Sequence, residues 1–140
     1  MIILDTNVLS ALMRPEPDPA VIKWLDRQPP ESIWITTVTV FEVEFRMALL
    51  PQGRRRMTLE NAYRDLLHHD LQNRVASFNQ EAATMAAALA ATRQLAGQAV
   101  DTQDTQIAGI AMARRATLAT RNVAHFQGLT TPVVNPWQTA

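Results

Sequence analysis

The stretch Ile2-Ile3-Leu4-Asp5-Thr6-Asn7 ends a short apolar run with a carboxylate, a hydroxyl and an amide, directly before a helix-like segment. Three later stretches repeat this pattern: residues 35–42 (ITTVTVFE), 101–108 (DTQDTQIA) and 118–122 (LATRN). In a parallel α/β domain, the carboxyl ends of the strands and the starts of the following helices meet at one edge of the sheet. We therefore expect the polar residues of the four stretches to gather at that edge.

Apolar runs and helical patterns alternate along the whole chain. Strands are predicted over residues 1–4, 33–38, 74–77, 117–120 and 133–134, and helices over 8–13, 18–28, 39–50, 54–69, 81–95 and 104–115. Neither a repeat nor a linker divides the chain. We predict one domain over residues 1–140, a three-layer α/β/α sandwich with a central parallel sheet.

Composition narrows the class of protein. The 47% hydrophobic and 19% charged content is typical of a globular chain, and 140 residues suffice for one core. The lack of cysteine excludes disulfides and thiolate metal sites. The 13 basic and 13 acidic residues balance, which argues against a broad non-specific grip on nucleic acid. Because the sequence shows no signal-peptide pattern and no long apolar run, we expect a cytoplasmic protein without membrane contact.

Three acids, Asp5, Glu42 and Asp104, are the candidate metal ligands, and each has a structural alternative. Asp5 can cap the helix that follows it. Asp101 and Asp104 can divide between them the roles of N-cap and first-turn acid. Glu42 completes a capping box with Thr39, which makes a structural role the better interpretation of Glu42 taken alone.

The three acids together are stronger evidence for a metal site than any one of them alone. Three carboxylates at equivalent positions of one sheet edge, without a nearby Lys, repel one another unless a cation bridges them. Mg²⁺ and Mn²⁺ favour such all-oxygen sites. A zinc site is disfavoured because the three histidines do not have its spacing to these acids: His68, His69 and His125.

In this order, the four stretches resemble the motifs of PIN-domain ribonucleases. The similarity is greatest to VapC-type toxins, especially the FitB-like branch of plasmid stability proteins. Two further stretches are similar to that branch: Met13-Arg14-Pro15-Glu16-Pro17 and Val134-Asn135-Pro136-Trp137. The resemblance covers nearly the whole chain and implies the α/β/α sandwich predicted above.

Carried over residue by residue, the resemblance places Asp5, Glu42 and Asp104 at the three core acidic positions of the family. It implies that Asp5 and Asp104 are ligands of Mg²⁺ or Mn²⁺, and that Glu42 is a ligand or the base that orients water. Asn122 stands where many relatives have a fourth acid, and His125 where they often have Asp. We therefore expect one firm metal site and a second, weaker one.

Further residues are predicted around this site. Thr6, Asn7, Thr120 and Asn122 are expected to orient the carboxylates, although capping of helix starts is an equal alternative for the first three. Arg121, Arg54 and Arg55 are candidates for RNA phosphate contact, with a solvated charged surface as the plainer alternative. The tryptophans can stack on bases, but core packing is their commoner role.

The predicted function is the toxin of a type II toxin–antitoxin system, acting as a Mg²⁺- or Mn²⁺-dependent endoribonuclease. The resemblance implies an RNA substrate, a cognate antitoxin, a homodimer, and operator DNA binding only through the antitoxin complex. It also implies inhibition by an antitoxin arginine that takes the place of the cation. Two alternatives stay open: a catalytically weak partner that works through the antitoxin complex, and a metal-dependent nuclease acting on DNA or structured nucleic acid.

Overall fold

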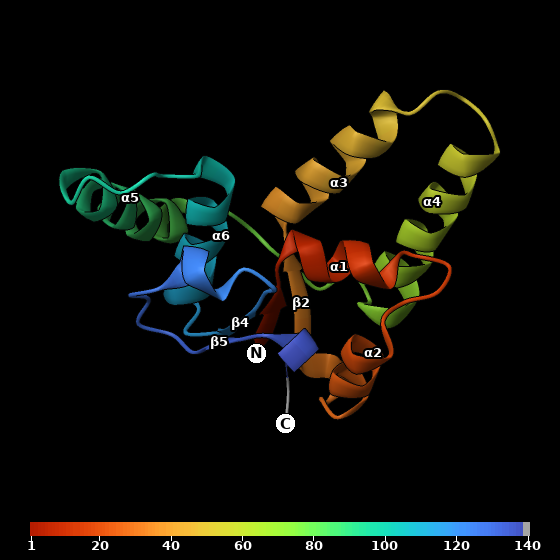
Figure 1. Cartoon of the computed structure of the whole chain (residues 1–140), viewed down its shortest axis with the longest axis horizontal. Coiled ribbons are helices and arrows are strands. Elements are labelled where there is room, and N and C mark those ends of the chain that lie inside the picture. Colours follow the sequence, from red (N-terminus) through yellow and green to blue (C-terminus); the bar gives the residue numbers. More distant parts are fainter. Residues whose placement is uncertain (139–140) are drawn as a thin grey trace.

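The computed structural model describes residues 1–138, and its centre is a five-stranded parallel sheet (Figure 1). The strands are β1 (Ile2–Leu4), β2 (Ile33–Thr36), β3 (Val75–Ala76), β4 (Thr117–Ala119) and β5 (Val133–Val134). Their order is β3-β2-β1-β4-β5, and all neighbours are parallel. The central strand β1 is therefore flanked by β2 and β4, which confirms the predicted parallel sheet.

Helices cover both faces of this sheet. On one side lie α1 (Thr6–Leu12), α2 (Pro19–Asp26) and α4 (Arg54–Asp65), and on the other lie α5 (Gln80–Leu95) and α6 (Thr102–Ala113) (Figure 1). The remaining helix, α3 (Thr37–Leu49), leaves the sheet edge between them. Its Val38 packs with the α5–α6 side, while Val43 and Met47 pack with the α1–α2 side. The predicted three-layer sandwich is confirmed.

Short helical turns complete the chain: η1 (Pro30–Ser32), η2 (Leu66–Asp70), η3 (Val123–Phe126) and η4 (Pro136–Gln138). Of these, η2 is a π turn that widens the end of the helix predicted over residues 54–69. The Leu71 N–H bonds to the Leu66 carbonyl at 2.8 Å, and this wide turn lets the Leu71 side chain reach the core.

Three helices begin two residues before their predicted starts: α1 at Thr6, α3 at Thr37 and α6 at Thr102. The strand predicted over residues 33–38 ends at Thr36, whose hydroxyl caps α3 by accepting a hydrogen bond from the Thr39 N–H at 3.1 Å. Thr39 lies inside the helix, so the predicted capping box with Glu42 is wrong. The last helix begins at Thr102 instead of residue 104, because Asp101 is its N-cap.

The α5–α6 pair packs closely because both helices carry small residues. A Cβ atom added to Gly109 would lie 2.5 Å from the Ala82 carbonyl oxygen and 2.7 Å from Ala86 Cβ. Glycine is therefore required at this crossing, which fixes the helix that carries Asp104.

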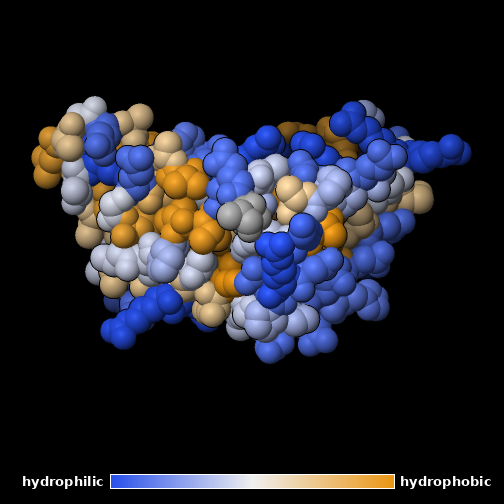
Figure 2. All heavy atoms as spheres, turned by 60° about the horizontal axis from the view of Figure 1, so that its bottom comes forward, coloured by the Kyte–Doolittle hydropathy of each residue, from blue (hydrophilic) through white to orange (hydrophobic). Residues whose placement is uncertain are grey.

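The molecular surface is mixed in character. On the face shown in Figure 2, apolar groups are interrupted by hydrophilic side chains. Within residues 1–138, every helix is too short or too polar to cross a lipid bilayer.

Candidate active site

Asp5 lies at the end of the central strand and is almost completely buried, with 3% of its surface exposed. It is the N-cap of α1, since its Oδ1 accepts a hydrogen bond from the Thr6 N–H at 2.8 Å. Its Oδ2 accepts one from the Thr120 hydroxyl at 2.8 Å and one from the Asn7 amide at 3.3 Å. Asp5 therefore caps α1, and its carboxylate also lines the cavity described below.

Burial has a strong electrostatic effect on Asp5. It raises the pKa of this carboxyl from 3.8 to about 6, against the lowering effect of the hydrogen bonds from Thr120 and Thr6. The nearby carboxylates of Asp104 and Glu42 raise this pKa further. The three predicted acids therefore lie close enough to repel one another.

Glu42 is fixed by the first residue of α1. Its Oε1 accepts a hydrogen bond from the Thr6 hydroxyl at 2.9 Å, and its Oε2 lies 3.6 Å from the Arg46 guanidinium, as the helical spacing predicts. Burial raises the pKa of Glu42, while the Thr6 hydrogen bond and the Arg46 charge oppose the rise.

A line of hydroxyls leads to Glu42. Thr36 Oγ1 donates to Thr39 Oγ1 at 3.4 Å, and Thr39 Oγ1 lies 2.9 Å from Thr6 Oγ1. The single hydroxyl proton of Thr6 is directed to the Glu42 carboxylate, so Thr39 donates to Thr6. All three threonines are buried, which fixes the Glu42 carboxylate relative to β2 and α1.

Asp104 lies in the first turn of α6, and Asp101 caps the helix by accepting a hydrogen bond from the Asp104 N–H at 2.8 Å. The two acids thus divide the cap and first-turn roles as predicted. Asp104 Oδ2 lies 3.2 Å from Nδ1 of His125, which comes from η3. Burial raises the pKa of Asp104, and the contact with His125 opposes this.

Asp5, Glu42 and Asp104 line one cavity of about 270 Å³. They reach it from the end of β1, from α3 and from the first turn of α6. The chain folds this way because β1 is central in the sheet and the three helix starts crowd its carboxyl end.

The architecture and the sequence agree on a family. The PIN domain profile matches residues 2–127. The chain belongs to the PIN domain family.

Relatives match this PIN domain over nearly their whole length. The plasmid stability protein StbB of Pseudomonas syringae pv. tomato (strain ATCC BAA-871 / DC3000) is 42% identical, over 99% of each chain. The VapC ribonuclease Y4jK of Sinorhizobium fredii (strain NBRC 101917 / NGR234) is 36% identical, over 100% of each. Toxin FitB of Neisseria gonorrhoeae (strain ATCC 700825 / FA 1090) is 31% identical, over 98% of this chain and 99% of the toxin.

A solved structure extends the similarity to three dimensions. The structure of FitAB bound to an IR36 DNA fragment superposes with a TM-score of 0.89 at 30% identity, over 100% of this PIN domain and 98% of the matched chain.

The donor set of the PIN domain cavity suits a hard divalent cation, because it consists of carboxylate, hydroxyl and amide oxygens. In this structure the three carboxylates do not converge on one point. Within residues 1–138, no group of three acidic, histidine or cysteine side chains is arranged to hold an ion. Asp104 is engaged by His125 and Glu42 by Arg46, so each has a cationic or hydrogen-bonding partner in this conformation.

The four predicted orienting residues contact the acids to different degrees. Thr6 bonds Glu42, while Thr120 and Asn7 bond Asp5. Asn122 lines the cavity, but the hydrogen bond that it donates is from its backbone N–H to Thr120 Oγ1 at 3.1 Å.

Of the predicted RNA-binding arginines, Arg121 lies at the cavity and the others do not line it. The Arg121 guanidinium lies over the Trp137 ring, 4.8 Å from its centroid. Arg54 and Arg55 begin α4, which Figure 1 shows projecting with the far end of α3 away from the sheet. Of the three predicted arginines, Arg121 is therefore the one best placed to contact a phosphate at the acids.

Two further features were missed by sequence reasoning. Arg14 lines the cavity beside Asn7, Ser10 and Ala11. The positions 7, 10, 11 and 14 have the spacing of one helical face, which was a usable signal, although α1 ends at Leu12 and Arg14 follows its C-cap. The contact of His125 with Asp104 joins residues 21 apart, and no local pattern encodes it.

Proposed function

We propose that this PIN domain is the toxin of a type II toxin–antitoxin system and cleaves RNA as a Mg²⁺- or Mn²⁺-dependent endoribonuclease. The observation that carries the proposal is the shared cavity of Asp5, Glu42 and Asp104. The names of the relatives support it, since one is a VapC ribonuclease and another a toxin. The whole chain is proposed to act as a single PIN-like domain.

Asp5 and Asp104 are proposed as the cation's ligands, with Glu42 as a third ligand or as the base that orients water. A bound Mg²⁺ or Mn²⁺ would supply Lewis acidity and a water of lowered pKa. Burial raises the pKa of all three carboxyls, the charge of Asp104 raises the pKa of Asp5 and Glu42 further, and that of Asp101 raises the pKa of Asp104. A cation would relieve this existing cost.

The remaining side chains are proposed to orient the carboxylates and to bind the RNA phosphate. Thr120 and Thr6 fix the directions of the Asp5 and Glu42 carboxylates through hydrogen bonds of 2.8 and 2.9 Å. Arg121, held over Trp137, is proposed to bind a phosphate oxygen at the rim.

The proposed partners are a cognate antitoxin, a second copy of the chain, and operator DNA reached through the antitoxin complex. The 30% identical structure is described as FitAB bound to a DNA fragment, which supports an assembly of this kind. An antitoxin arginine entering the acidic cavity would compete with the cation for the same carboxylates.

A second candidate is a catalytically weak toxin homologue that acts through the antitoxin complex. The engagement of Asp104 by His125 and of Glu42 by Arg46 favours it, because both contacts would have to open for a cation.

Cleavage of a mixed single-stranded RNA pool separates the two candidates. The purified protein is incubated with Mg²⁺, Mn²⁺ or EDTA, beside Asp5→Asn. Asp18→Asn is the matched control, because Asp18 also caps a helix, α2, but is exposed and outside the cavity. Metal-dependent cutting that is lost only in Asp5→Asn supports the ribonuclease. Equal traces of cutting in all three proteins support the second candidate, and a DNA pool run in parallel tests the alternative substrate.

A further inference from the structure

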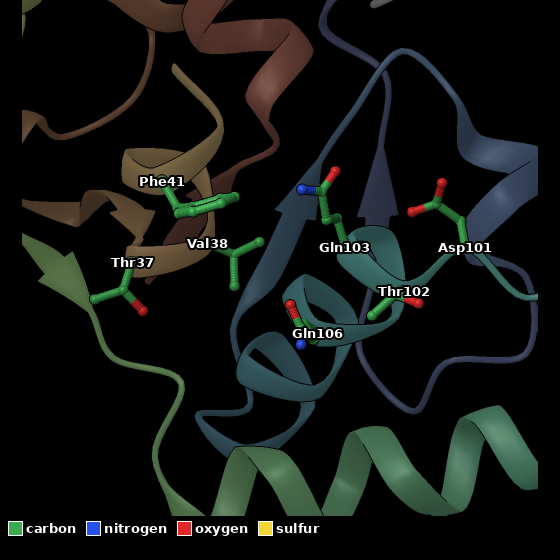
Figure 3. A pocket seen from close by; sticks show the side chains of 7 residues that line it. All are labelled: Thr37, Val38, Phe41, Asp101, Thr102, Gln103 and Gln106. Carbon is green, nitrogen blue, oxygen red and sulfur yellow. The ribbon is translucent and has the colours of Figure 1, made fainter. Parts of the chain in front are cut away.

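A second cavity opens between the starts of α3 and α6. Its volume is about 620 Å³, and its walls include Thr37, Val38 and Phe41 on one side and Gln103 and Gln106 on the other. Figure 3 shows the Phe41 ring and the Gln103 amide projecting toward the same gap from the two helices. The next residues along the chain, Glu42 and Asp104, line the acidic cavity. The two cavities are therefore built on the same two helices.

An exposed aromatic surface on α3 borders this cavity; it consists of Phe41, which lines the cavity, and Phe45, which does not. Phe41 is 62% exposed and Phe45 is 54% exposed, although phenylalanine side chains are usually buried. Their rings are stacked, with centroids 5.8 Å apart and planes inclined by 8°. A flat aromatic surface in water is a ready platform for another planar ring.

The α6 side supplies hydrogen-bonding groups. Gln103 and Gln106 are partly buried, and neither amide is bonded to another group within residues 1–138. Each amide carries both donors and an acceptor, so it can pair with the edge of a heterocyclic base.

The charge of the cavity disfavours a phosphate as its ligand. In the described part of the chain, its lining contains neither Lys nor Arg, and Asp101 is its charged residue. A neutral, planar group with donors and acceptors on its edge fits these walls better than an anion. Among the parts of a nucleotide, that group is the base.

We propose that this cavity is a nucleobase subsite, which holds the base of a nucleotide next to the scissile phosphate. The base stacks on Phe41 and presents its edge to Gln103 and Gln106. The inference rests on the proposed ribonuclease function, since the acidic cavity positions the phosphate. It requires single-stranded RNA, because a base must leave its stack to enter.

Binding in EDTA tests the subsite without cleavage. Fluorescence anisotropy is measured with labelled RNA hexamers, each also made with an abasic ribose at one position. Phe41→Ala should weaken binding about tenfold, the size expected for one stacked base. Phe41→Tyr should restore affinity because it restores the ring. Leu49→Ala is the matched control, since Leu49 is 69% exposed on the same helix but outside the cavity.

The abasic hexamers identify the base concerned. At one position the missing base should weaken binding to wild type, and Phe41→Ala should add no further loss. With Mn²⁺, Phe41→Ala should also flatten the base preference at one position beside the cut.

Three outcomes overturn the subsite. Wild-type protein that cuts RNA, with an unchanged pattern and affinity in Phe41→Ala, removes the subsite and leaves the ribonuclease standing. Wild-type protein that cuts nothing with metal removes both proposals. A smaller species of Phe41→Ala in sedimentation velocity would show that the aromatic surface joins two copies of the chain.

Discussion

The Thr6 hydroxyl donates a hydrogen bond of 2.9 Å to Glu42 Oε1, and so joins the first turn of α1 to α3 across 36 residues of sequence. The same residue gives its backbone N–H to Asp5. Thr6 thus orients two of the three acids at once. Its position explains how Glu42, a residue with a plausible capping role in sequence, is directed into the cavity instead.

Replacing Thr6 by Val should impair the site while keeping the side chain's shape. The buried Glu42 carboxylate would lose its hydroxyl donor, at a cost of about 1–3 kcal/mol in unfolding free energy. Because this hydrogen bond lowers the pKa of Glu42, the acidic limb of the pH–rate profile should move to higher pH. RNA cleavage should fall about 10- to 100-fold.

Thr6→Ser is the control, because it keeps the hydroxyl and removes the methyl group. Urea denaturation and pH–rate profiles of both variants show whether the hydroxyl or the methyl group of Thr6 is responsible. If Thr6→Ser is as impaired as Thr6→Val, packing of the methyl group explains the loss and the hydrogen bond does not.

The sequence predicted the sheet and its acidic edge because both depend on local patterns. Apolar runs of strand length end at polar residues in 2–7 and 118–122, and parallel connection brings such ends together. The start of α3 was misplaced for a physical reason. Residues 33–40 are rich in β-branched residues, and Thr36, Thr37 and Thr39 can all act as N-caps, so composition did not locate the boundary.

The side-chain contacts that set the electrostatics of the site could not be predicted from the sequence. The contact of His125 with Asp104 and the position of Arg121 over Trp137 join residues from separate elements. Exposure of Phe41 was equally hidden, since an apolar residue in a helix is normally taken as core. Such features follow from how the helices sit on the sheet.

The raised pKa of Asp5 predicts a pH dependence of stability in metal-free protein. A carboxyl with a pKa of about 6 when folded and about 3.8 when unfolded binds more protons in the folded state between these values. The contribution of Asp5 to stability should therefore be greatest below pH 4, fall as pH rises to 6, and then level off. The fall is about 3 kcal/mol for a shift of this size.

Asp5→Asn should abolish most of this fall, so in EDTA at pH 7 the variant should be more stable than wild type. Urea denaturation at pH 4.5, 6 and 7.5 measures it. Asp18→Asn controls for the loss of an exposed capping charge. If the stability difference between Asp5→Asn and wild type does not change between pH 4.5 and 7.5, the burial cost assigned to Asp5 is contradicted.

Arg121→Ala should weaken RNA binding, whereas Arg54→Ala should not. Arg121 lines the acidic cavity, while Arg54 lies at the start of α4, outside it. Loss of one phosphate contact to single-stranded RNA should reduce the slope of log K against log salt by about 0.7. Anisotropy titrations from low to high salt in EDTA measure this slope. Equal losses in both variants would mean that the RNA path extends along α4.

Gly109→Ala should loosen the support of Asp104. The added methyl group would lie 2.5 Å from the Ala82 carbonyl oxygen, so α5 and α6 must separate. Overpacking of this kind costs about 1–3 kcal/mol, and activity should fall because α6 carries Asp104. Thermal unfolding of Gly109→Ala is measured alone and in combination with Ala86→Gly. The second change removes one of the two clashes, so it should restore stability in part; no loss in Gly109→Ala alone would show that the helices yield freely.

Asp104→Asn and Asp101→Asn form the most direct pair for the metal site. The two acids lie three residues apart on α6, but Asp104 lines the acidic cavity while Asp101 is the N-cap, a role that Asn fills about as well. In EDTA, Asp104→Asn should be more stable than wild type, because it removes a half-buried charge repelled by Asp101 and close to Asp5 and Glu42.

With Mn²⁺ at about 100 times its Kd, wild type and Asp101→Asn should each gain about 2.7 kcal/mol, and Asp104→Asn should gain far less. Thermal unfolding over a Mn²⁺ series measures these gains without any RNA. The readout therefore stands apart from cleavage and from contaminating nucleases. If Asp104→Asn keeps the full Mn²⁺ stabilisation, Asp104 is a first-turn acid of α6 and the cation, if bound, is held elsewhere.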